Sequence, residues 1–290
     1  NNIVKDLHNA IESFDQPFSG TITSYFMSKV ASKYVKVALS GDGADELFGS
    51  YKFPRSTEAI YRLSKNKFKN DFIKNSKDYN SNLLNYKQIN NLELYEIKDL
   101  CLNINSKNIM DILKNKELKT STIDYLKQVS QKFNFEKDII NKSLMIDFSS
   151  LLPDQVLSFV DILSMQHSLE IRPPFLDNDL IDLAFRIPGE YKIVNSNPKI
   201  ILKEALKRIV PKEILYRKKE GFVMPIEDIF IKKNKKLLNK ILSKKNIQEH
   251  NLFNQDFIKN LIKNVDKNNF YQNNQLWISY CFQNWWNKNF

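Results

Sequence analysis

The residues best suited to chemistry in this chain lie in one short stretch, SGDGADE, at residues 40–46. The sequence has six glycines in all, and two of them, Gly41 and Gly43, flank Asp42 here. Glycines at these places let the backbone approach a ligand closely and expose its amides to phosphate oxygens. Asp42 can serve as a base beside such a ligand. The stretch therefore predicts a site for a phosphate-bearing molecule.

Two further carboxylates, Asp45 and Glu46, complete this acidic stretch. They can hold a hard cation such as Mg²⁺, which takes carboxylate and phosphate oxygens together. The same residues also suit the beginning of a helix, where a capping side chain and early acidic residues match the helix dipole. The residues alone leave both interpretations open.

The elements before this stretch predict how it is positioned. Apolar residues at helical spacing predict a helix over 21–33, and the apolar, β-branched run 34–40 predicts a buried parallel strand directly after it. Helix, strand and acidic loop in this order are typical of an open α/β sheet whose strands end at a binding crevice. The predicted class is therefore α/β.

Most of the remaining chain is predicted to be helical. Residues 56–150 contain no glycine or proline and carry apolar residues at helical intervals. Further helices are expected from about Pro153 to Ser168 and over 178–187, where Pro188 follows. The segment 199–210 is predicted to be amphipathic, and the aromatic C-terminal segment 275–290 to be a packing helix. The side chains expected to face inward in the amphipathic segment are Leu202, Ala205, Leu206 and Ile209.

Two other charged segments invite an interpretation. In SLEIRPPFLD (168–177), Glu170 and Arg172 lie among apolar neighbours, which favours a structural ion pair with each other or with Asp177. In RKKEGF (217–222), three cations precede a glycine, as in a loop that delivers positive charge to a polyphosphate. An exposed charge run is the alternative for this second segment.

The composition disfavours several classes of protein. The formal net charge is +11, but lysine occurs with an excess of asparagine and isoleucine, which indicates compositional bias rather than a nucleic-acid surface. No apolar run approaches the length of a membrane span, and the N-terminal residues lack a basic-then-apolar signal. Cys101 and Cys281 have no metal or redox spacing and are expected to be reduced and buried. A cytoplasmic protein without nucleic-acid or membrane partners is expected.

Three segments, taken in order, resemble one known family. They are SGDGADELFGSY (40–51), DILSMQHSLEIRPPFLD (161–177) and KIILKEALKRIVPKEILYRKKEGFVMP (199–225). They resemble the C-terminal synthetase domain of the glutamine-dependent asparagine synthetase family, of the asparagine synthetase B type. FDQPF (14–18) and the tryptophan-bearing C-terminal helix also fit. Over residues 1–290 the resemblance implies a mostly helical part of an adenine-nucleotide alpha-hydrolase-like (PP-loop ATP pyrophosphatase) synthetase domain, with a remnant of its parallel sheet.

The resemblance also implies a reaction and a set of site residues. In this family, a carbon–nitrogen ligase, ATP activates the side-chain carboxylate of aspartate as an acyl adenylate, and pyrophosphate leaves. Ammonia delivered from glutamine then attacks, which gives asparagine and AMP. ATP and Mg²⁺ are the implied cofactors, and a homodimer is left open. By resemblance, the nucleotide meets Ser40 and Gly41, the catalytic residues are Asp42 and Lys219, and the metal ligands are Asp45 and Glu46.

The sequence also departs from the family. The phosphate loop Ser-Gly-Gly-x-Asp-Ser and the glutaminase domain are absent, so these 290 residues are expected to be a C-terminal part that is inactive alone. Phe159 and Ile162 stand where Lys and Arg are common, and Ser50 replaces a usual Gly. These departures leave open a relative that acts on a sugar, peptide or lactam precursor, and also a degenerate relative without catalytic activity.

Overall fold

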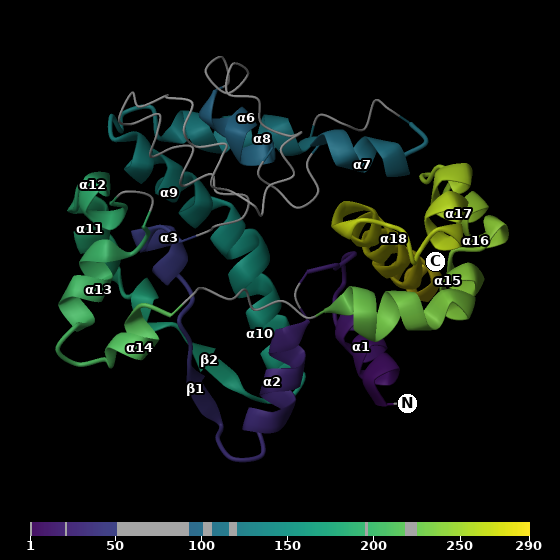
Figure 1. The fold of residues 1–290 in the computed structure, drawn as a ribbon, viewed down its shortest axis with the longest axis horizontal. Helices are drawn as coiled ribbons and strands as arrows, with labels where there is room; N and C mark the ends of the chain where they lie inside the picture. The colour runs from purple at the N-terminus through teal and green to yellow at the C-terminus, as the bar shows by residue number, and fades with distance from the viewer. Residues whose placement is uncertain are drawn as a thin grey trace.

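The computed structural model describes residues 2–20, 22–50, 93–100, 106–115, 121–194, 197–217 and 225–290. Within these residues the protein is mostly helical and contains a two-stranded parallel sheet (Figure 1). The predicted mostly helical class with a small parallel sheet is therefore confirmed. No described helix has the length and apolar character needed to cross a membrane.

The described elements follow one another along the chain from α1 to α18, with strand β1 in the N-terminal part and β2 near the middle. The first part holds α1 (Asn2–Glu12), α2 (Thr23–Ala31), β1 (Val37–Leu39), α3 (Ala44–Phe48), α6 (Leu94–Leu100), α7 (Ser106–Ile112), α8 (Ser121–Lys132) and α9 (Ile139–Ser149). The middle holds the π-helix η3 (Leu152–Leu157), α10 (Ser158–Met165), β2 (Glu170–Arg172), the 3₁₀ helix η4 (Pro174–Leu176), α11 (Asn178–Arg186), α12 (Gly189–Lys192), α13 (Ile200–Leu206) and α14 (Lys212–Leu215). The last part holds the π-helix η5 (Glu227–Ile231), the 3₁₀ helix η6 (Lys232–Asn234), α15 (Lys235–Ile241), α16 (Lys244–His250), α17 (Gln255–Lys263) and α18 (Phe270–Asn289).

The sheet joins two segments that are far apart in the sequence. β1 and β2 run parallel, and Ala38 is paired with Ile171 at the centre of the register. Each strand is preceded by a helix, α2 before β1 and α10 before β2, and these two helices pack against each other. The helix and strand predicted over 21–40 are therefore present, although the strand is shorter than expected. Both strands end at the same edge of the sheet because they are parallel.

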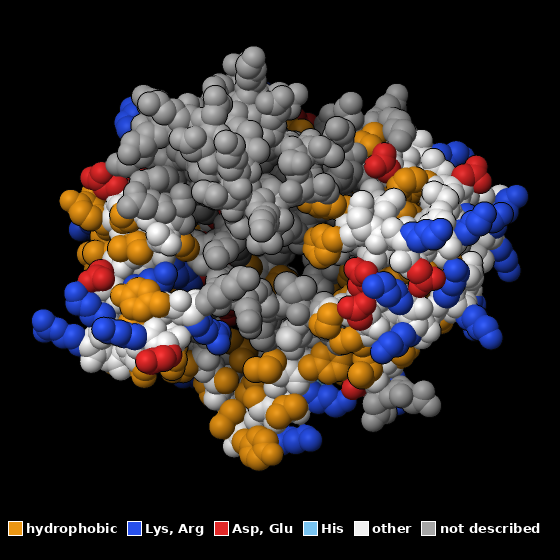
Figure 2. Space-filling view, viewed as in Figure 1, with side chains coloured by type: hydrophobic (Ala, Val, Ile, Leu, Met, Phe, Trp, Pro, Cys, Tyr) orange, Lys and Arg blue, Asp and Glu red, His pale blue; other side chains and the backbone are white. Residues whose placement is uncertain are grey.

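The prediction that the strand is buried is wrong for the described residues. Val37 and Leu39 are exposed, Leu39 to 75%, whereas Ala38 on the opposite face is partly buried. Side chains alternate between the two faces of a strand, so one face of this small sheet is open and the other is not. Figure 2 shows hydrophobic side chains gathered at the lower end of this view, over α2 and the loop that leads to β1. The apolar residues of β1 therefore indicate that this segment favours a strand, and not that other described elements cover it.

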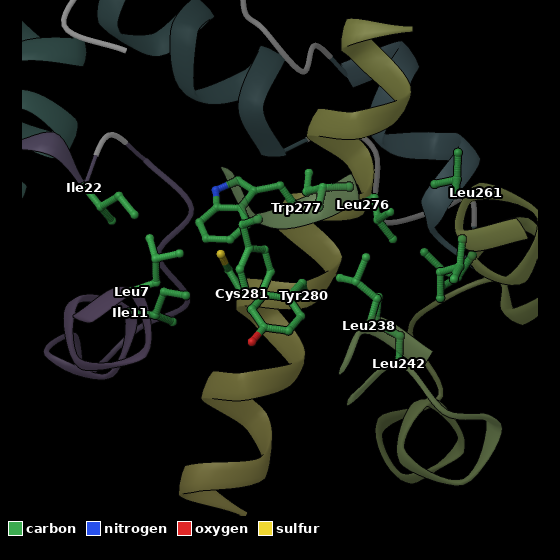
Figure 3. Close-up of a cluster of buried hydrophobic side chains, with 14 of the residues drawn as sticks. Leu7, Ile11, Ile22, Leu238, Leu242, Leu261, Leu276, Trp277, Tyr280 and Cys281 are labelled. Atoms are coloured by element: carbon green, nitrogen blue, oxygen red, sulfur yellow. The ribbon is translucent and has the colours of Figure 1, made fainter. Parts of the chain in front are cut away.

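The main hydrophobic core lies around α18. Trp277, Tyr280 and Cys281 are at most 5% exposed and pack with side chains from α1 and from the C-terminal helices. Figure 3 shows these residues between Leu7 and Ile11 of α1 on one side and residues of α15 on the other. The predicted packing role of the aromatic C-terminal helix and the predicted burial of Cys281 are confirmed. Cys101 lies outside the described residues.

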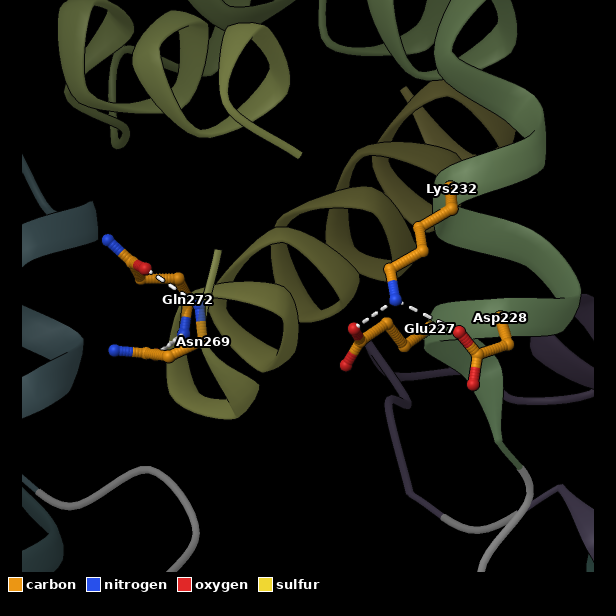
Figure 4. Close-up of polar contacts among 5 residues, drawn as sticks. All are labelled: Glu227, Asp228, Lys232, Asn269 and Gln272. Carbon is orange, nitrogen blue, oxygen red and sulfur yellow. Dashed lines mark hydrogen bonds and ion pairs between the residues drawn. The ribbon is translucent and has the colours of Figure 1, made fainter. Parts of the chain in front are cut away.

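Side-chain caps and ion pairs fix the ends of the C-terminal elements. Asn269 and Gln272 form a reciprocal capping box at the beginning of α18 (Figure 4). In η5 and η6, Lys232 lies between Glu227 and Asp228, with its ammonium 2.6 Å and 3.0 Å from their carboxylate oxygens. The first residue of α18 is thereby defined, and η5 is tied to the segment that leads to α15.

Two smaller hydrophobic clusters support the sheet side of the molecule. One joins α6, α8 and α9, and the other joins α3 to α11 and α13. The helix predicted from Pro153 instead begins as the π-helix η3 and ends as α10 at Met165. The amphipathic prediction for 199–210 is partly wrong, because Ala205 and Ile209 are exposed and α13 ends at Leu206. Leu202 packs against the α3 cluster as expected.

Candidate active site

The loops that follow the two strands meet at the carboxyl edge of the sheet. Ser40 continues the ladder past β1, and its backbone N–H donates to the carbonyl of Arg172 at 3.0 Å. Gly43 is buried against the loop after β2, where a Cβ atom in its place would lie 2.4 Å from Leu176 Cδ2. Ligands of open α/β sheets bind outside the carboxyl ends of the strands. The SGDGADE stretch therefore occupies the expected position for a ligand site.

The first three residues of the stretch differ in what they present. The hydroxyl of Ser40 donates a 2.7 Å hydrogen bond to Asp42 Oδ2, which orients that carboxylate. Gly41 is exposed, and a Cβ atom there would have no neighbour within 4 Å, so its backbone is open to an approaching molecule. Asp42 is partly exposed and keeps an oxygen beyond the one bonded to Ser40. These three residues can contact a ligand through one backbone segment and one oriented carboxylate.

The two remaining carboxylates lie on α3 in different environments. Asp45 is partly exposed and forms an ion pair with Lys199, a residue 154 positions further along the chain. Glu46 is buried, with 1% of its surface exposed. Lys199 was not singled out from the sequence, where it was simply the first residue of a predicted amphipathic helix. Its signal was a cation that directly follows Asn197–Pro198, where a helix is about to begin.

The segment after β2 is held by local polar contacts. Arg172 Nε donates to Glu170 Oε1 at 2.8 Å, so the predicted ion pair between these residues is confirmed, although both side chains are more than half exposed. Asp177 caps α11, accepting hydrogen bonds from the N–H groups of Asp179 and Leu180 at 3.1 Å and 3.3 Å. These carboxylates shape the edge of the sheet through structural contacts.

The described residues offer a divalent cation few protein ligands at this site. Among the described ranges, the protein contains no group of three or more His, Cys, Asp or Glu side chains that could hold a metal ion. Mg²⁺ commonly takes one or two protein carboxylates and completes its shell with phosphate and water oxygens. The accessible carboxylate of Asp45 suits a Mg²⁺ ion that arrives bound to phosphate. Lys219 and the rest of 218–224 lie outside the described residues.

The three departures from the family pattern have defined surroundings. Phe159, in the first turn of α10, lies with its ring centroid 5.6 Å from that of Phe18, which belongs to FDQPF. Ile162 packs against the main core, and Ser50 is buried. At the two positions where the resemblance implies Lys and Arg, the chain therefore carries apolar side chains engaged in packing.

These elements define a mostly helical α/β domain with an acidic, glycine-bearing loop at the carboxyl edge of a parallel sheet. The sequence matches the family model described as asparagine synthase over residues 1–287. The chain therefore belongs to the asparagine synthase family, whose domain has the adenine nucleotide alpha-hydrolase-like fold.

Two curated relatives from Bacillus subtilis (strain 168) show the extent of the similarity. Asparagine synthetase [glutamine-hydrolyzing] 1 is 31% identical over 242 residues, which cover 77% of this chain and 36% of the relative. Asparagine synthetase [glutamine-hydrolyzing] 3 is 27% identical over 264 residues, which cover 90% of this chain and 38% of the relative. The matched part thus spans little more than a third of the length of either relative.

Proposed function

We propose that the protein to which these residues belong uses ATP to convert aspartate into asparagine. In the first step an oxygen of the aspartate side-chain carboxylate bonds to the α-phosphorus, and pyrophosphate leaves with the electrons of the broken P–O bond. In the second step the nitrogen of ammonia bonds to the activated carbonyl carbon, and AMP leaves as the C–O bond breaks. The nitrogen loses a proton to a base. In the full-length protein, the ammonia is proposed to come from glutamine.

The family match over residues 1–287 carries this proposal, and the geometry of the acidic loop supports it. A reaction that transfers an adenylyl group needs an anion site with preplaced charges, because negative charge builds on the phosphate oxygens. The loop after β1 offers an open backbone at Gly41 and accessible carboxylates at Asp42 and Asp45. This combination suits a nucleotide whose phosphates carry a divalent cation.

Each residue of the loop then has a separate task. Ser40 and Gly41 bind the nucleotide, and the open space at Gly41 admits it against the backbone. Asp42, oriented by the hydroxyl of Ser40, takes the proton from the attacking nitrogen. Asp45 binds Mg²⁺, which neutralises phosphate charge when it is bound. Glu46 was assigned to the metal with Asp45, but its burial makes Asp45 the more accessible ligand. Lys219 is proposed to stabilise the phosphates on the resemblance alone.

The test is aspartate-dependent release of pyrophosphate from ATP by the full-length protein, with Mg²⁺ concentration as the variable. Asp45→Asn should lower the rate by about 10²-fold and raise the Mg²⁺ concentration needed for half-maximal rate. Asp179→Asn is the control, because Asp179 is an exposed carboxylate in the first turn of a helix, α11, and has no role in the proposed site. Unchanged Mg²⁺ dependence in Asp45→Asn would remove Asp45 from the metal site.

The same assay separates the alternative functions. Pyrophosphate release with a sugar, peptide or lactam precursor, and none with aspartate, would assign a different acceptor, and the apolar Phe159 and Ile162 make this a specific alternative. Binding of ATP without release for any acceptor would indicate a degenerate relative. Tight binding of RNA that weakens steeply with salt would instead favour the basic surface, although Figure 2 shows Asp and Glu interspersed among the Lys and Arg side chains of this face.

A further inference from the structure

The ion pair between Asp45 and Lys199 joins the acidic loop to the first residue of the segment 199–225, a contact that the sequence did not predict. Both side chains are partly exposed, 20% for Asp45 and 23% for Lys199, so solvent and small ligands can reach the pair. The contact is close, and it lies at the loop proposed to receive the nucleotide. The ammonium of Lys199 is therefore a positive charge of the protein itself, next to the Asp45 carboxylate that is proposed to bind Mg²⁺.

The backbone of Lys199 holds its side chain at this place. Lys199 immediately precedes α13 and has φ 59° and ψ 29°, in the left-handed region that a residue with a Cβ rarely adopts. Its N–H donates to the carbonyl of Phe48, the last residue of α3, at 3.1 Å. The backbone of Lys199 is thus fixed against α3, and its flexible side chain keeps the ammonium within reach of Asp45 and of a ligand bound beside it.

Stability alone is a weak reason for this arrangement. A left-handed lysine is strained, and a partly exposed ion pair contributes little to folding because water and salt screen it. Glycine or asparagine would satisfy the same backbone conformation with less strain. Strained residues of this kind concentrate at functional sites, where the surrounding structure holds them in place.

We propose that Lys199 is a phosphate-binding residue that exchanges partners when the ligand arrives. In the ligand-free protein its ammonium neutralises Asp45. With Mg²⁺ and pyrophosphate or the ATP phosphates present, Asp45 would hold the metal and the ammonium of Lys199 would bind a phosphate oxygen instead. This inference rests on the proposed metal role of Asp45 and adds to it a second, exchangeable cation from α13.

The exchange makes two opposite predictions for one variant. In a variant that lacks the ammonium of Lys199, a free divalent cation no longer has to displace it from Asp45 and should bind more tightly. Pyrophosphate in the presence of the metal loses a cationic contact and should bind more weakly. A residue that only braced α3 would weaken both equilibria together, because the loop would lose its shape.

The experiment measures binding of Mn²⁺ alone, and of pyrophosphate at saturating Mn²⁺, to the full-length protein by titration calorimetry. Lys199→Asn is the main variant because asparagine tolerates left-handed φ and is uncharged. It should bind Mn²⁺ more tightly and pyrophosphate about tenfold more weakly, the scale of one charge-assisted contact. Lys199→Arg should retain pyrophosphate binding, and Lys207→Asn, which removes an exposed lysine paired with Glu204, should change neither equilibrium.

The outcomes distinguish this inference from the proposed function beneath it. The exchange would be overturned, and the role of Asp45 left intact, if Lys199→Asn bound both Mn²⁺ and pyrophosphate as the wild type does. The same conclusion would follow if Lys199→Asn and Lys199→Met both bound Mn²⁺ and pyrophosphate more weakly. Failure of the wild-type protein to bind pyrophosphate with Mn²⁺, or wild-type affinities in Asp45→Asn, would overturn both. Opposite shifts in Lys199→Asn that disappear in an Asp45→Asn background would support the exchange.

Discussion

Replacing Gly43 with alanine should destabilise the loop that carries the candidate site. Gly43 has φ 90°, so an alanine there would be strained by about 1–2 kcal/mol. Its Cβ would also lie 2.4 Å from Leu176 Cδ2 and 3.1 Å from Leu176 Cγ, an overlap that costs about 1–3 kcal/mol to relieve. The expected loss in free energy of unfolding is therefore about 2–5 kcal/mol, a large part of the roughly 5–15 kcal/mol that holds a typical domain together.

Gly41→Ala provides a matched control two residues away. A Cβ atom at Gly41 would meet nothing within 4 Å, and its φ lies outside the positive range. Its unfolding free energy should change by less than about 1 kcal/mol, with a small gain because alanine restricts the unfolded chain. Urea unfolding followed by circular dichroism measures both variants. Nucleotide binding measured on the same samples should weaken in Gly41→Ala, since its new methyl group enters the space assigned to the ligand.

A second background separates strain from overlap. Leu176→Ala removes the side chain that the new Cβ would meet, so Gly43→Ala should cost less in this background by about 1–3 kcal/mol. The remaining loss should be the part due to positive φ. Equal losses for Gly41→Ala and Gly43→Ala would refute the reasoning, and so would a loss that Leu176→Ala leaves unchanged, because the close approach of the two loops would then have no energetic effect.

Two further predictions concern buried charges in the helical part. Lys192 is fully buried beside Asn141, and burial lowers its pKa to about 8 from 10.5. Between pH 8 and pH 10.5 the unfolded chain therefore binds more protons than the folded chain, so the free energy of unfolding should rise by about 3 kcal/mol over this range. A rise of the same size in Lys192→Met would contradict this. The ammonium of Lys98 lies 2.5 Å from Asp147 Oδ2 in the interior. Lys98→Met should therefore lower the free energy of unfolding, measured in urea, by about 3–5 kcal/mol, because it leaves the carboxylate of Asp147 buried without its cation. Adding Asp147→Leu should recover most of that loss, and no loss in Lys98→Met would show that the pair is energetically unimportant.

The local elements around the site could be predicted from sequence because their signals are local. The periodicity of 21–33 predicts α2, and Pro188 follows α11 as expected. These two features depend on a few consecutive residues, so the sequence alone specifies them. The strand β2 was not predicted, and Asp177, offered as an ion-pair partner of Glu170 or Arg172, instead caps α11.

Features that depend on distant residues could not be predicted in this way. The exposure of Leu39 follows from which elements cover β1, and the exposure of Ile209 follows from the end of α13 at Leu206. The partner of Asp45 is Lys199, and only the folded chain brings these residues together. A pattern of residue types identifies a candidate charge, but it does not show which opposite charge will neutralise it.

The grouping of glycines around α3 has a geometric reason that joins the fold to the chemistry. Gly43 and Gly49, immediately before and after this five-residue helix, both have positive φ, so the chain can turn sharply at each end. Successive residues of a helix point about 100° apart, so Asp45 and Glu46 cannot both face the same ligand. The structure leaves Asp45 accessible and buries Glu46. A short helix between two glycines of positive φ therefore leaves one carboxylate partly exposed and buries the next, and Lys199 pairs with the exposed one.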